Sequence, residues 1–386
     1  MPLSTSLRDC TGCTACEAAC PVRCIEMKPD QFGFSHPKIT EPDKCLKCGK
    51  CDAVCPVACD KTACSEKEHA FAAFTKDQTI RERSSSGGIF SELSMQIIGA
   101  GGAVYGAVYD DDFSVKHLRI DNADDLQRCC GAKYSQSRLD NTFEQVKRDL
   151  KTEKTVLFSG SPCQVAGLHA FLGSDSDHLF CIDFVCHGVP SPAAWKEYLK
   201  YRSRESPITS INMRSKETGW SRYNYSIVIK YEDGSQYASK SSSDPYLKLF
   251  VGDFINRESC ENCHFKGYNR YSDVTLADFW GIWDLYPEMD DDKGTSALIV
   301  HTHKGAELLK KCKDKIVLKE VSPDEISKQN PSILFSSKAK PQRNDALKLA
   351  ADGEYDKVID LCFPQPEFAE KMRRKLGSLL QKMKRA

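Results

Sequence analysis

The sequence has no long hydrophobic run and no excess of charge of either sign. None of its apolar stretches approaches the roughly 18 to 20 residues that a membrane-spanning helix needs. Its 54 basic residues balance 54 acidic ones, which gives no electrostatic reason to expect a nucleic acid or an anionic membrane as partner. The N-terminus, Met-Pro-Leu-Ser-Thr-Ser, contains no apolar signal-peptide core. We therefore expect a cytoplasmic protein without a transmembrane segment.

A dinucleotide-binding fingerprint is also missing. The glycine cluster at residues 99–102 follows an expected helix and precedes an expected strand. A Rossmann motif needs the reverse order, because the phosphate must meet the N-terminus of a helix. Residues 85–88, Ser-Ser-Gly-Gly, do open an expected helix and could hold a phosphate or a flavin pyrophosphate. An ordinary serine N-cap explains them as well.

What the sequence has in abundance is cysteine. Of its 20 cysteines, 11 lie between Cys10 and Cys64. Disulfides would explain this density in a small secreted protein, but the chain has 386 residues and the spacing is that of metal ligands. The run Cys-x2-Cys-x2-Cys-x3-Cys-Pro starts at Cys10 and again at Cys45. This duplication predicts two 4Fe–4S clusters in a pseudo-twofold unit.

Each cluster is expected to take one ligand from the other run, because in two-cluster ferredoxins the cysteine before the proline binds the other cluster. Structural zinc is the alternative, but zinc sites pair Cys-x2-Cys knuckles instead of repeating a triple run. We interpret Cys24, Cys59 and Cys64 as small core residues. The predicted ligand sets are Cys10, Cys13, Cys16 and Cys55 for one cluster, and Cys45, Cys48, Cys51 and Cys20 for the other.

Beyond the cysteine-rich segment, helical and strand patterns alternate, which predicts an α/β layered domain. A hairpin is expected at residues 225–239, with Asp233-Gly234 at its turn. The other expected elements are helices at residues 89–98, 141–150, 165–172 and 192–202, and strands at 103–109, 155–158 and 179–185.

These patterns predict three parts. Residues 1–70 are expected to form an α+β ferredoxin-like two-cluster domain, residues 80–300 an α/β domain, and residues 301–386 a smaller α+β C-terminal part with a helical extension. Residues 76–83 are interpreted as a linker. The basic stretch 367–384 predicts an amphipathic helix that packs on the body or on a second subunit, with a membrane-surface role as the alternative.

Several motifs of the larger part, taken together and in this order, resemble the coenzyme F420 hydrogenase/dehydrogenase beta-subunit family. The match spans about residues 5 to 300. The resemblance implies a flavin domain, with FAD or FMN, that works with iron–sulfur clusters. The motifs are residues 85–88 with 102–106, residues 131–137, residues 158–168, residues 183–191, and Cys260-x2-Cys263 followed by residues 272–281.

Four cysteines lie inside these motifs: Cys163, Cys186, Cys260 and Cys263. The first two each follow an expected strand, where α/β sheets place their ligand-binding loops. We therefore expect a third 4Fe–4S cluster here. The alternatives are a redox-active thiol at Cys163, and zinc or plain packing for the Cys260 pair. The remaining cysteines lack ligand spacing and are interpreted as structural: Cys129, Cys130, Cys181, Cys312 and Cys362.

The motifs also contain candidate flavin contacts. Lys133 would stabilise the reduced ring, unless it is an ordinary surface lysine. His187 would donate a proton to the substrate, unless it packs against a cluster. The candidates are Ser85, Ser86, Gly87 and Gly88 at the phosphates, Lys133 and Tyr134 at the ring system, and Ser161 and Gln164 at its edge.

Two functions compete. One is a flavin- and iron–sulfur-dependent oxidoreductase that passes electrons between its clusters and FAD to convert a small molecule or F420, with ferredoxin or another low-potential carrier as partner. The other is a non-catalytic subunit that delivers electrons to a separate enzyme. Bacterial relatives with this layout are often associated with polysaccharide biosynthesis, an association that carries no activity. Fusion of both modules in one chain favours the oxidoreductase, and a homo-oligomer is left open.

Overall fold

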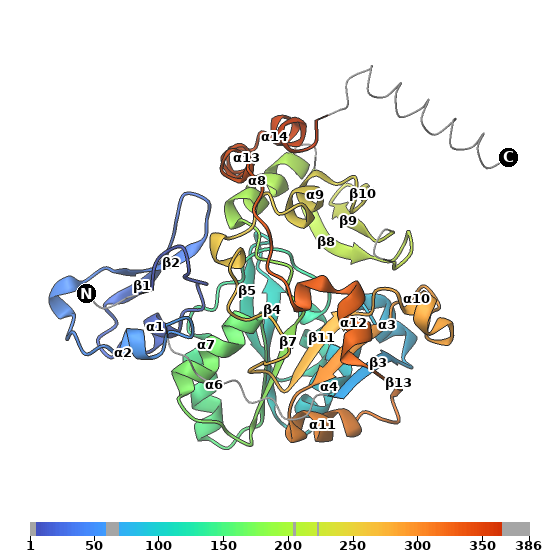
Figure 1. Cartoon of the computed structure of the whole chain (residues 1–386), viewed down its shortest axis with the longest axis horizontal. Coiled ribbons are helices and arrows are strands. Elements are labelled where there is room, and N and C mark those ends of the chain that lie inside the picture. Colours follow the sequence, from blue (N-terminus) through green and yellow to red (C-terminus); the bar gives the residue numbers. More distant parts are fainter. Residues whose placement is uncertain (1–4, 59–68, 204–205, 222–223, 365–386) are drawn as a thin grey trace.

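The structure is a computed structural model that describes residues 5–58, 69–203, 206–221 and 224–364. Figure 1 shows a small N-terminal module projecting to one side of a large central sheet, with α8, α9, α13 and α14 gathered at the top. Within the described ranges, no helix is long and apolar enough to cross a bilayer. The expected C-terminal helix at 367–384, Cys59 and Cys64 all lie outside the described residues.

The N-terminal module is a duplicated unit with a very small apolar core. Thr14 and Gly49 each follow the middle cysteine of a run, and both adopt left-handed backbone angles (φ 65° and 71°) just before a short helix. The buried core consists of Cys24, Ile25 and Cys51. The elements are α1 (Ala15–Ala18), β1 (Ile25–Pro29), β2 (Ser35–Ile39), η1 (Pro42–Lys44) and α2 (Lys50–Ala53), with β1 and β2 antiparallel.

The large sheet has eight strands in the order β13-β3-β12-β11-β7-β6-β4-β5. Its centre, β4, β6, β7 and β11, is parallel, and the flanking strands pair antiparallel. The strands are β3 (His69–Thr75), β4 (Ala103–Tyr109), β5 (Val115–Ile120), β6 (Val156–Ser159), β7 (Leu179–Phe184), β11 (Val274–Asp278), β12 (Ser296–Val300) and β13 (Ile316–Val321).

Helices cover both faces of this sheet, because its parallel strands are apolar on both sides. α4 (Ile89–Gly99) and α11 (His303–Lys310) share one core with the sheet, while α6 (Thr142–Lys151) and α7 (Pro162–Leu172) share another. The remaining elements of this domain are α3 (Gln78–Arg83), α5 (Ala123–Leu126), η2 (Gln127–Cys129), η3 (Glu258–Cys260), α10 (Ile282–Leu285), η4 (Pro287–Met289), α12 (Pro323–Gln329) and η5 (Pro331–Ile333).

A third layer combines a three-stranded antiparallel sheet with four helices. The last two helices pack on the first two, so the C-terminal helices share a core with a segment inserted more than a hundred residues earlier. The expected hairpin at 225–239 is present as β9 and β10. The elements are α8 (Pro192–Arg202), β8 (Ile208–Ser215), β9 (Ser226–Tyr231), β10 (Gln236–Lys240), α9 (Pro245–Val251), α13 (Arg343–Ala351) and α14 (Tyr355–Cys362).

The prediction of a mixed α/β architecture is confirmed, but two expected boundaries differ from the structure. Residues 76–83 are not a linker, because α3 lies there and its Arg81 is buried. The large sheet also reaches beyond residues 80–300, since it includes β3 and β13. Strand β3 is rich in alanine, which has a low strand propensity, and its pairing with two neighbouring strands decides its conformation.

Candidate functional site

The residues singled out from the sequence gather at one edge of the large sheet, beyond the carboxyl ends of its parallel strands. Cys163 follows β6, Cys186 follows β7, and Asp278 ends β11. At the same edge, antiparallel β12 begins with Ser296, whose Oγ accepts the N–H of Gly87 at 2.9 Å. Open α/β sheets bind ligands beyond this edge.

In the module, the structure brings together Cys10, Cys13, Cys16 and Cys55, here called the first set. Burial, with the charges of Cys10 and Cys55, raises the pKa of Cys13 to about 12. Burial also raises the pKa of Cys16, and the other three thiols add to that rise. These are the four cysteines that the crossed ligand assignment grouped.

The second set, Cys20, Cys45, Cys48 and Cys51, lines one pocket of about 320 Å³ of empty space. Cys24 lines it too, and its Sγ lies 3.5 Å from that of Cys20. Partial burial opposes charge on Cys20, but hydrogen bonds from nearby N–H groups lower its pKa. Backbone N–H groups aimed at sulfur are a feature of iron–sulfur sites.

The quartet, Cys163, Cys186, Cys260 and Cys263, comes from three loops of the large domain. Burial raises the pKa of Cys163 well above its usual range, and the charges of the other three thiols raise it further. Burial also raises the pKa of Cys186, while the nearby charges of Lys266 and Arg270 lower it. The structure therefore brings the four half-buried thiols together beside two cations.

Thiols with cations around them suit an anionic iron–sulfur cluster, which several thiolates hold in common. All cysteines within the described ranges are free thiols. No three His, Cys, Asp or Glu side chains of the described residues are placed to hold a single metal ion. The donor sets in the first set, the second set and the quartet each consist of four thiols, which is the ligand number of a 4Fe–4S cluster.

Comparison with known proteins identifies two domains. Residues 9–59 match the model of the 4Fe-4S dicluster domain. Residues 153–326 match the model of the C terminus of the coenzyme F420 hydrogenase/dehydrogenase beta subunit. Over residues 153–326 the chain is therefore similar to the C terminus of the coenzyme F420 hydrogenase/dehydrogenase beta subunit. The family resemblance and the 4Fe–4S dicluster domain expected from the sequence are both confirmed.

Among solved structures, similarity is found to a chain of the F420-reducing [NiFe] hydrogenase complex from Methanosarcina barkeri, studied as a xenon derivative. The two chains are 14% identical, with a TM-score of 0.46. The match covers 78% of this chain and 92% of that one. No curated protein matches this sequence.

Next to this beta-subunit domain, the loop at residues 85–88 is tightly held from two sides. The carbonyl oxygen of Ser86 accepts the Lys216 ammonium at 2.8 Å, and that of Ser85 accepts the Trp220 indole N–H at 3.2 Å. Gly87 is confined: an added Cβ would lie 2.4 Å from the carbonyl oxygen of Ala73. The loop is thus a rigid opening of α4, and the Ser86 hydroxyl is left buried without a partner.

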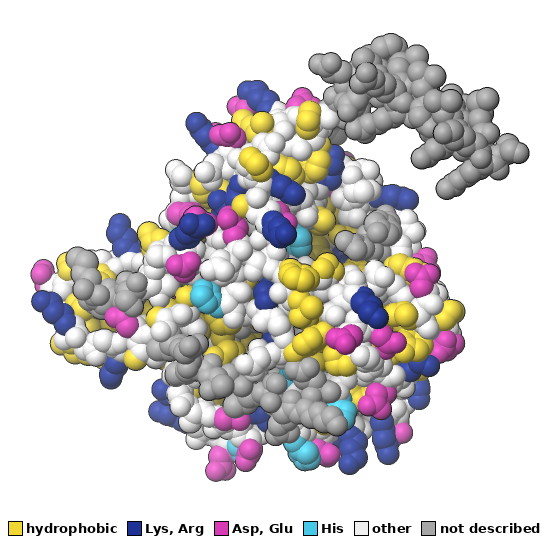
Figure 2. Space-filling view, in the orientation of Figure 1, with side chains coloured by type: hydrophobic (Ala, Val, Ile, Leu, Met, Phe, Trp, Pro, Cys, Tyr) yellow, Lys and Arg dark blue, Asp and Glu magenta, His cyan; other side chains and the backbone are white. Residues whose placement is uncertain are grey.

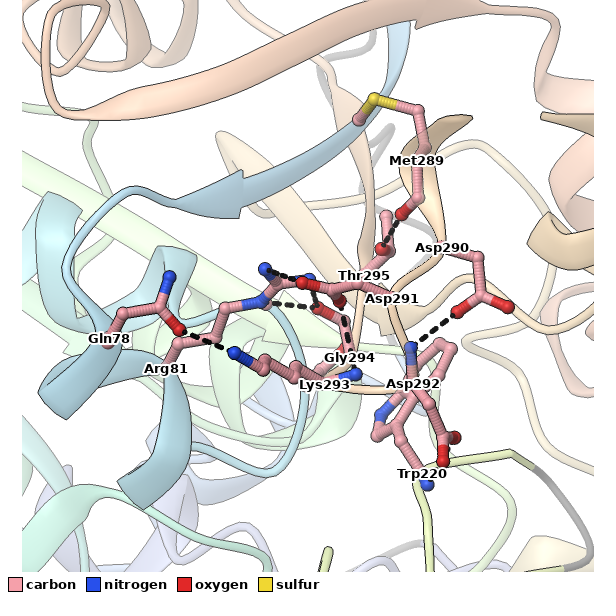
Figure 3. Close-up of polar contacts among 12 residues, drawn as sticks. Gln78, Arg81, Trp220, Met289, Asp290, Asp291, Asp292, Lys293, Gly294 and Thr295 are labelled. Atoms are coloured by element: carbon pink, nitrogen blue, oxygen red, sulfur yellow. Dashed lines mark hydrogen bonds and ion pairs between the residues drawn. The ribbon is translucent and has the colours of Figure 1, made fainter. Parts of the chain in front are cut away.

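Acidic residues of the 289–295 segment contact the buried Arg81 of α3, as Figure 3 shows. The buried Arg81 guanidinium makes two hydrogen bonds to Asp291, at 2.8 and 2.6 Å, and also donates to the Gly294 carbonyl oxygen. The N–H of Trp220 donates to Asp292. These contacts fix α3 and Trp220 against the 289–295 segment.

Lys133 and Tyr134 lie on an irregular segment that crosses the edge. Burial lowers the pKa of Lys133, whose ammonium donates to the carbonyl oxygens of Cys130 and Gly131. The alternative of a solvated surface lysine is therefore wrong. The Tyr134 hydroxyl lies 3.4 Å from Arg214, so this tyrosine contacts a buried charge.

Ser161 and Gln164 form a capping box at the start of α7. The backbone N–H of Ser161 donates to Gln164 Oε1 at 3.0 Å. Gln164 Nε2 donates to Ser137 Oγ, which ties the helix to the segment that carries Lys133. Ser161 Oγ lies 3.2 Å from Cys163 Sγ, so this pair orients the first thiol of the quartet.

His187 lies between Asp253, Ser332 and the ring of Phe250. Its Nε2 lies 2.9 Å from Asp253 Oδ1, its Nδ1 lies 3.5 Å from Ser332 Oγ, and its ring meets Phe250 edge-on. Burial opposes charge on Asp253, but the hydrogen bond and charge of His187 lower its pKa below the usual range. The pair keeps the imidazole next to Cys186 and about one-third exposed.

Among the buried arginines that the sequence analysis did not single out, Arg214 and Arg257 lie near the candidate site. Arg214 forms an ion pair with Asp278 at 2.8 Å and lies over the rings of Tyr225 and Trp280. Arg257 joins the module to the large domain. Neither stands in a motif with a recognisable spacing. Arg214 is buried by the pairing of β8 with its neighbours, and Arg257 by the docking of the module. The position of Arg257, three residues before Cys260, was the one available signal.

Surface charge contrasts with this buried charge. Figure 2 shows basic and acidic side chains interspersed over one face of the molecule, without a large patch of one sign. The cations near the candidate site are instead buried or half-buried in the protein interior. They are Lys133, Arg214, Arg257, Lys266 and Arg270.

Proposed function

We propose that this chain is an iron–sulfur flavoprotein oxidoreductase of the cytoplasm. It takes single electrons from ferredoxin or another low-potential carrier and delivers them in pairs to a small molecule or to F420. The observation that carries the proposal is the placement of the quartet: three loops bring four thiols together beside two cations at the ligand-binding edge of the sheet. Three four-thiol sets correspond to three 4Fe–4S clusters.

Orphaned polar atoms support a flavin, FAD or FMN, at the same edge. The Ser86 hydroxyl, two nitrogens of Arg214 and one oxygen of Asp278 are buried and have no hydrogen-bond partner in the described part of the chain. Such groups are rare in folded proteins, and a polar ligand would satisfy them. A bound flavin would supply the exchange between one-electron and two-electron chemistry. Residues 85–88, with Lys133, Tyr134, Ser161 and Gln164, are the proposed contacts.

The chain's own residues would prepare the reaction. Lys133 holds its ammonium toward the edge through two carbonyl oxygens, at 3.0 and 3.2 Å, and can face developing negative charge there. His187 is oriented by Asp253, and its Nδ1 side is the candidate proton donor to substrate. Partial burial of the quartet limits the access of water to the thiols.

A second candidate function is electron delivery to a separate enzyme. Leu334 and Phe335 are exposed by 40% and 63%, and they directly precede Ser336, whose hydroxyl accepts the N–H of Cys263 at 3.0 Å. An exposed apolar pair so close to the quartet suits a partner protein that receives electrons there. Turnover of a small-molecule panel by the purified protein alone separates this alternative from the oxidoreductase.

The proposal is tested by counting iron and flavin in anaerobically purified protein. Wild type should carry about twelve iron atoms per chain, and Cys260→Ser about eight, because one 4Fe–4S cluster is lost. Cys312→Ser is the matched control, since Cys312 is a buried thiol that packs in the sheet core, and it should keep the wild-type count. An unchanged count in Cys260→Ser, or protein that cannot be reconstituted with flavin, would refute the proposal.

A further inference from the structure

The module meets the large domain through the buried side chain of Arg257. Its Nε donates to the carbonyl oxygen of Cys10 at 2.8 Å, and its Nη2 donates to that of Ser35 at 2.9 Å. On the side of the large domain, Arg257 lies in the same turn as Cys260. The N–H of Cys260 donates to the Arg257 carbonyl oxygen at 3.0 Å. One residue thus links a member of the first set to a member of the quartet.

A second contact joins the same two groups. An added Cβ at Gly167 would lie 2.9 Å from both Cβ and Sγ of Cys13, so only glycine allows α7 to approach the first set this closely. Gly167 is four residues after Cys163, on the same face of α7 and about 6 Å along the helix axis. The helix that carries a quartet thiol in its first turn therefore touches the first set one turn later.

The charge of Arg257 has no carboxylate to balance it among the described residues. Its side-chain partners are two carbonyl oxygens, the Gln136 amide oxygen at 3.1 Å and the His36 ring. A buried guanidinium without an anion is costly. Anionic clusters in the first set and in the quartet would lie on either side of it and supply the missing negative charge.

We propose that Arg257 and Gly167 form the junction through which single electrons pass between the first set and the quartet. Arg257 positions both sites and holds a positive charge between them, while Gly167 permits the close approach. The inference rests on the proposed function, because it needs a cluster at each end. With clusters held by the first set and by the quartet, the junction would pass one electron from the first to the second, with no bond broken and no proton transferred.

The second set then lies on the side away from the large domain. α1 packs on α6 and α7, whereas Cys48 is exposed beside Leu46 at the opposite end of the module. Electrons from a carrier would enter at the second set, cross to the first set, and leave through the junction. This order follows from which end of the module touches α7.

Redox titration followed by electron paramagnetic resonance tests the role of Arg257. Arg257→Met should keep all the iron but lower the reduction potential of a cluster next to the junction, because a nearby cation favours the reduced, more negative form. Arg257→Lys restores the charge and should recover much of the potential. Arg343→Met is the control: Arg343 bonds the Asn256 carbonyl oxygen in the same loop but does not bond the module.

Stopped-flow reduction tests Gly167. Gly167→Ala should slow electron arrival at the quartet, because the added methyl group forces α7 and Cys13 apart. Gly99→Ala, at the end of α4 where a Cβ meets nothing within 4 Å, should leave the rate unchanged. Unchanged potentials in Arg257→Met or an unchanged rate in Gly167→Ala, at full iron content, would overturn the junction alone. A wild type without the quartet's iron would instead overturn the proposed function.

Discussion

The two cysteine-rich regions of this molecule are built in opposite ways. In the module, each triple run places three cysteines within seven residues of sequence, on either side of a left-handed residue such as Thr14 or Gly49. In the large domain, the quartet is collected from loops after β6 and β7 and from the turn at Cys260. Local spacing defines the first kind of site, and a complete sheet must exist before the second kind can form.

The apolar cores of the module and of the large domain also differ, in size and in composition. The module buries Cys24, Ile25 and Cys51 as its own core, so two of its three core residues are cysteines. The large sheet buries separate apolar clusters on its two faces, made mostly of aliphatic and aromatic side chains. A domain with so little apolar burial needs a metal or another cross-link to be stable. We infer that iron holds the module together and that the sheet holds the quartet together.

The largest expected effect follows from removing iron with a chelator under reducing conditions. Amide protons of β1 and β2 should lose their protection from hydrogen exchange completely, because cluster binding supplies most of the module's folding free energy. Those of β6 and β7 should keep theirs. Equal loss in both regions would show that the quartet's cluster also supports the sheet, and equal retention would show that the module folds without metal.

The same contrast explains how much the sequence could predict. The 4Fe–4S dicluster domain was predictable because a cluster imposes spacing on a short peptide, and the helices α4, α6, α7 and α8 because their signals lie within a few turns of sequence. Strand β3 and the burial of Arg81 and Arg257 were not, because they depend on partners far along the chain: β12, Asp291 and Cys10 respectively. Motifs marked the quartet's members, but only the sheet shows that they meet.

A second prediction concerns the pH dependence of stability that a buried histidine gives the sheet region. His117 on β5 is buried, lies 2.9 Å from the Ser159 carbonyl oxygen and stacks on Phe158. Burial lowers its pKa from the usual 6.5 to about 4. Between these values the unfolded chain binds a proton that the folded chain does not, so stability is lost as the pH falls through this window. The loss can reach on the order of 3 kcal/mol.

His117→Gln should remove this part of the pH dependence, since glutamine does not titrate and its amide can still reach Ser159. The measurement is the free energy of unfolding of wild type and variant at pH 7 and at pH 5. The difference between the two proteins should shrink or change sign at pH 5, because acid destabilises the wild type alone. His178→Gln is the control, because His178 is exposed. A constant difference across that range would mean that His117 is not buried in its neutral form.

The smallest expected effect concerns the ion pair in Figure 3. Asp291→Asn keeps an acceptor for Arg81 but removes the charge, and the Gly294 carbonyl oxygen still binds the guanidinium at 3.0 and 3.1 Å. Because the Asp291 carboxylate is 45% exposed, solvent screens it, and we expect a cost of about 1 kcal/mol in urea unfolding. Asp290→Asn, which keeps an acceptor for the N–H of Asp292 and removes a charge that makes no ion pair with Arg81, should cost less. A cost of about 3 kcal/mol or more, the range for a broken buried pair, would mean that the sheet region depends on a single polar contact much as the module depends on iron.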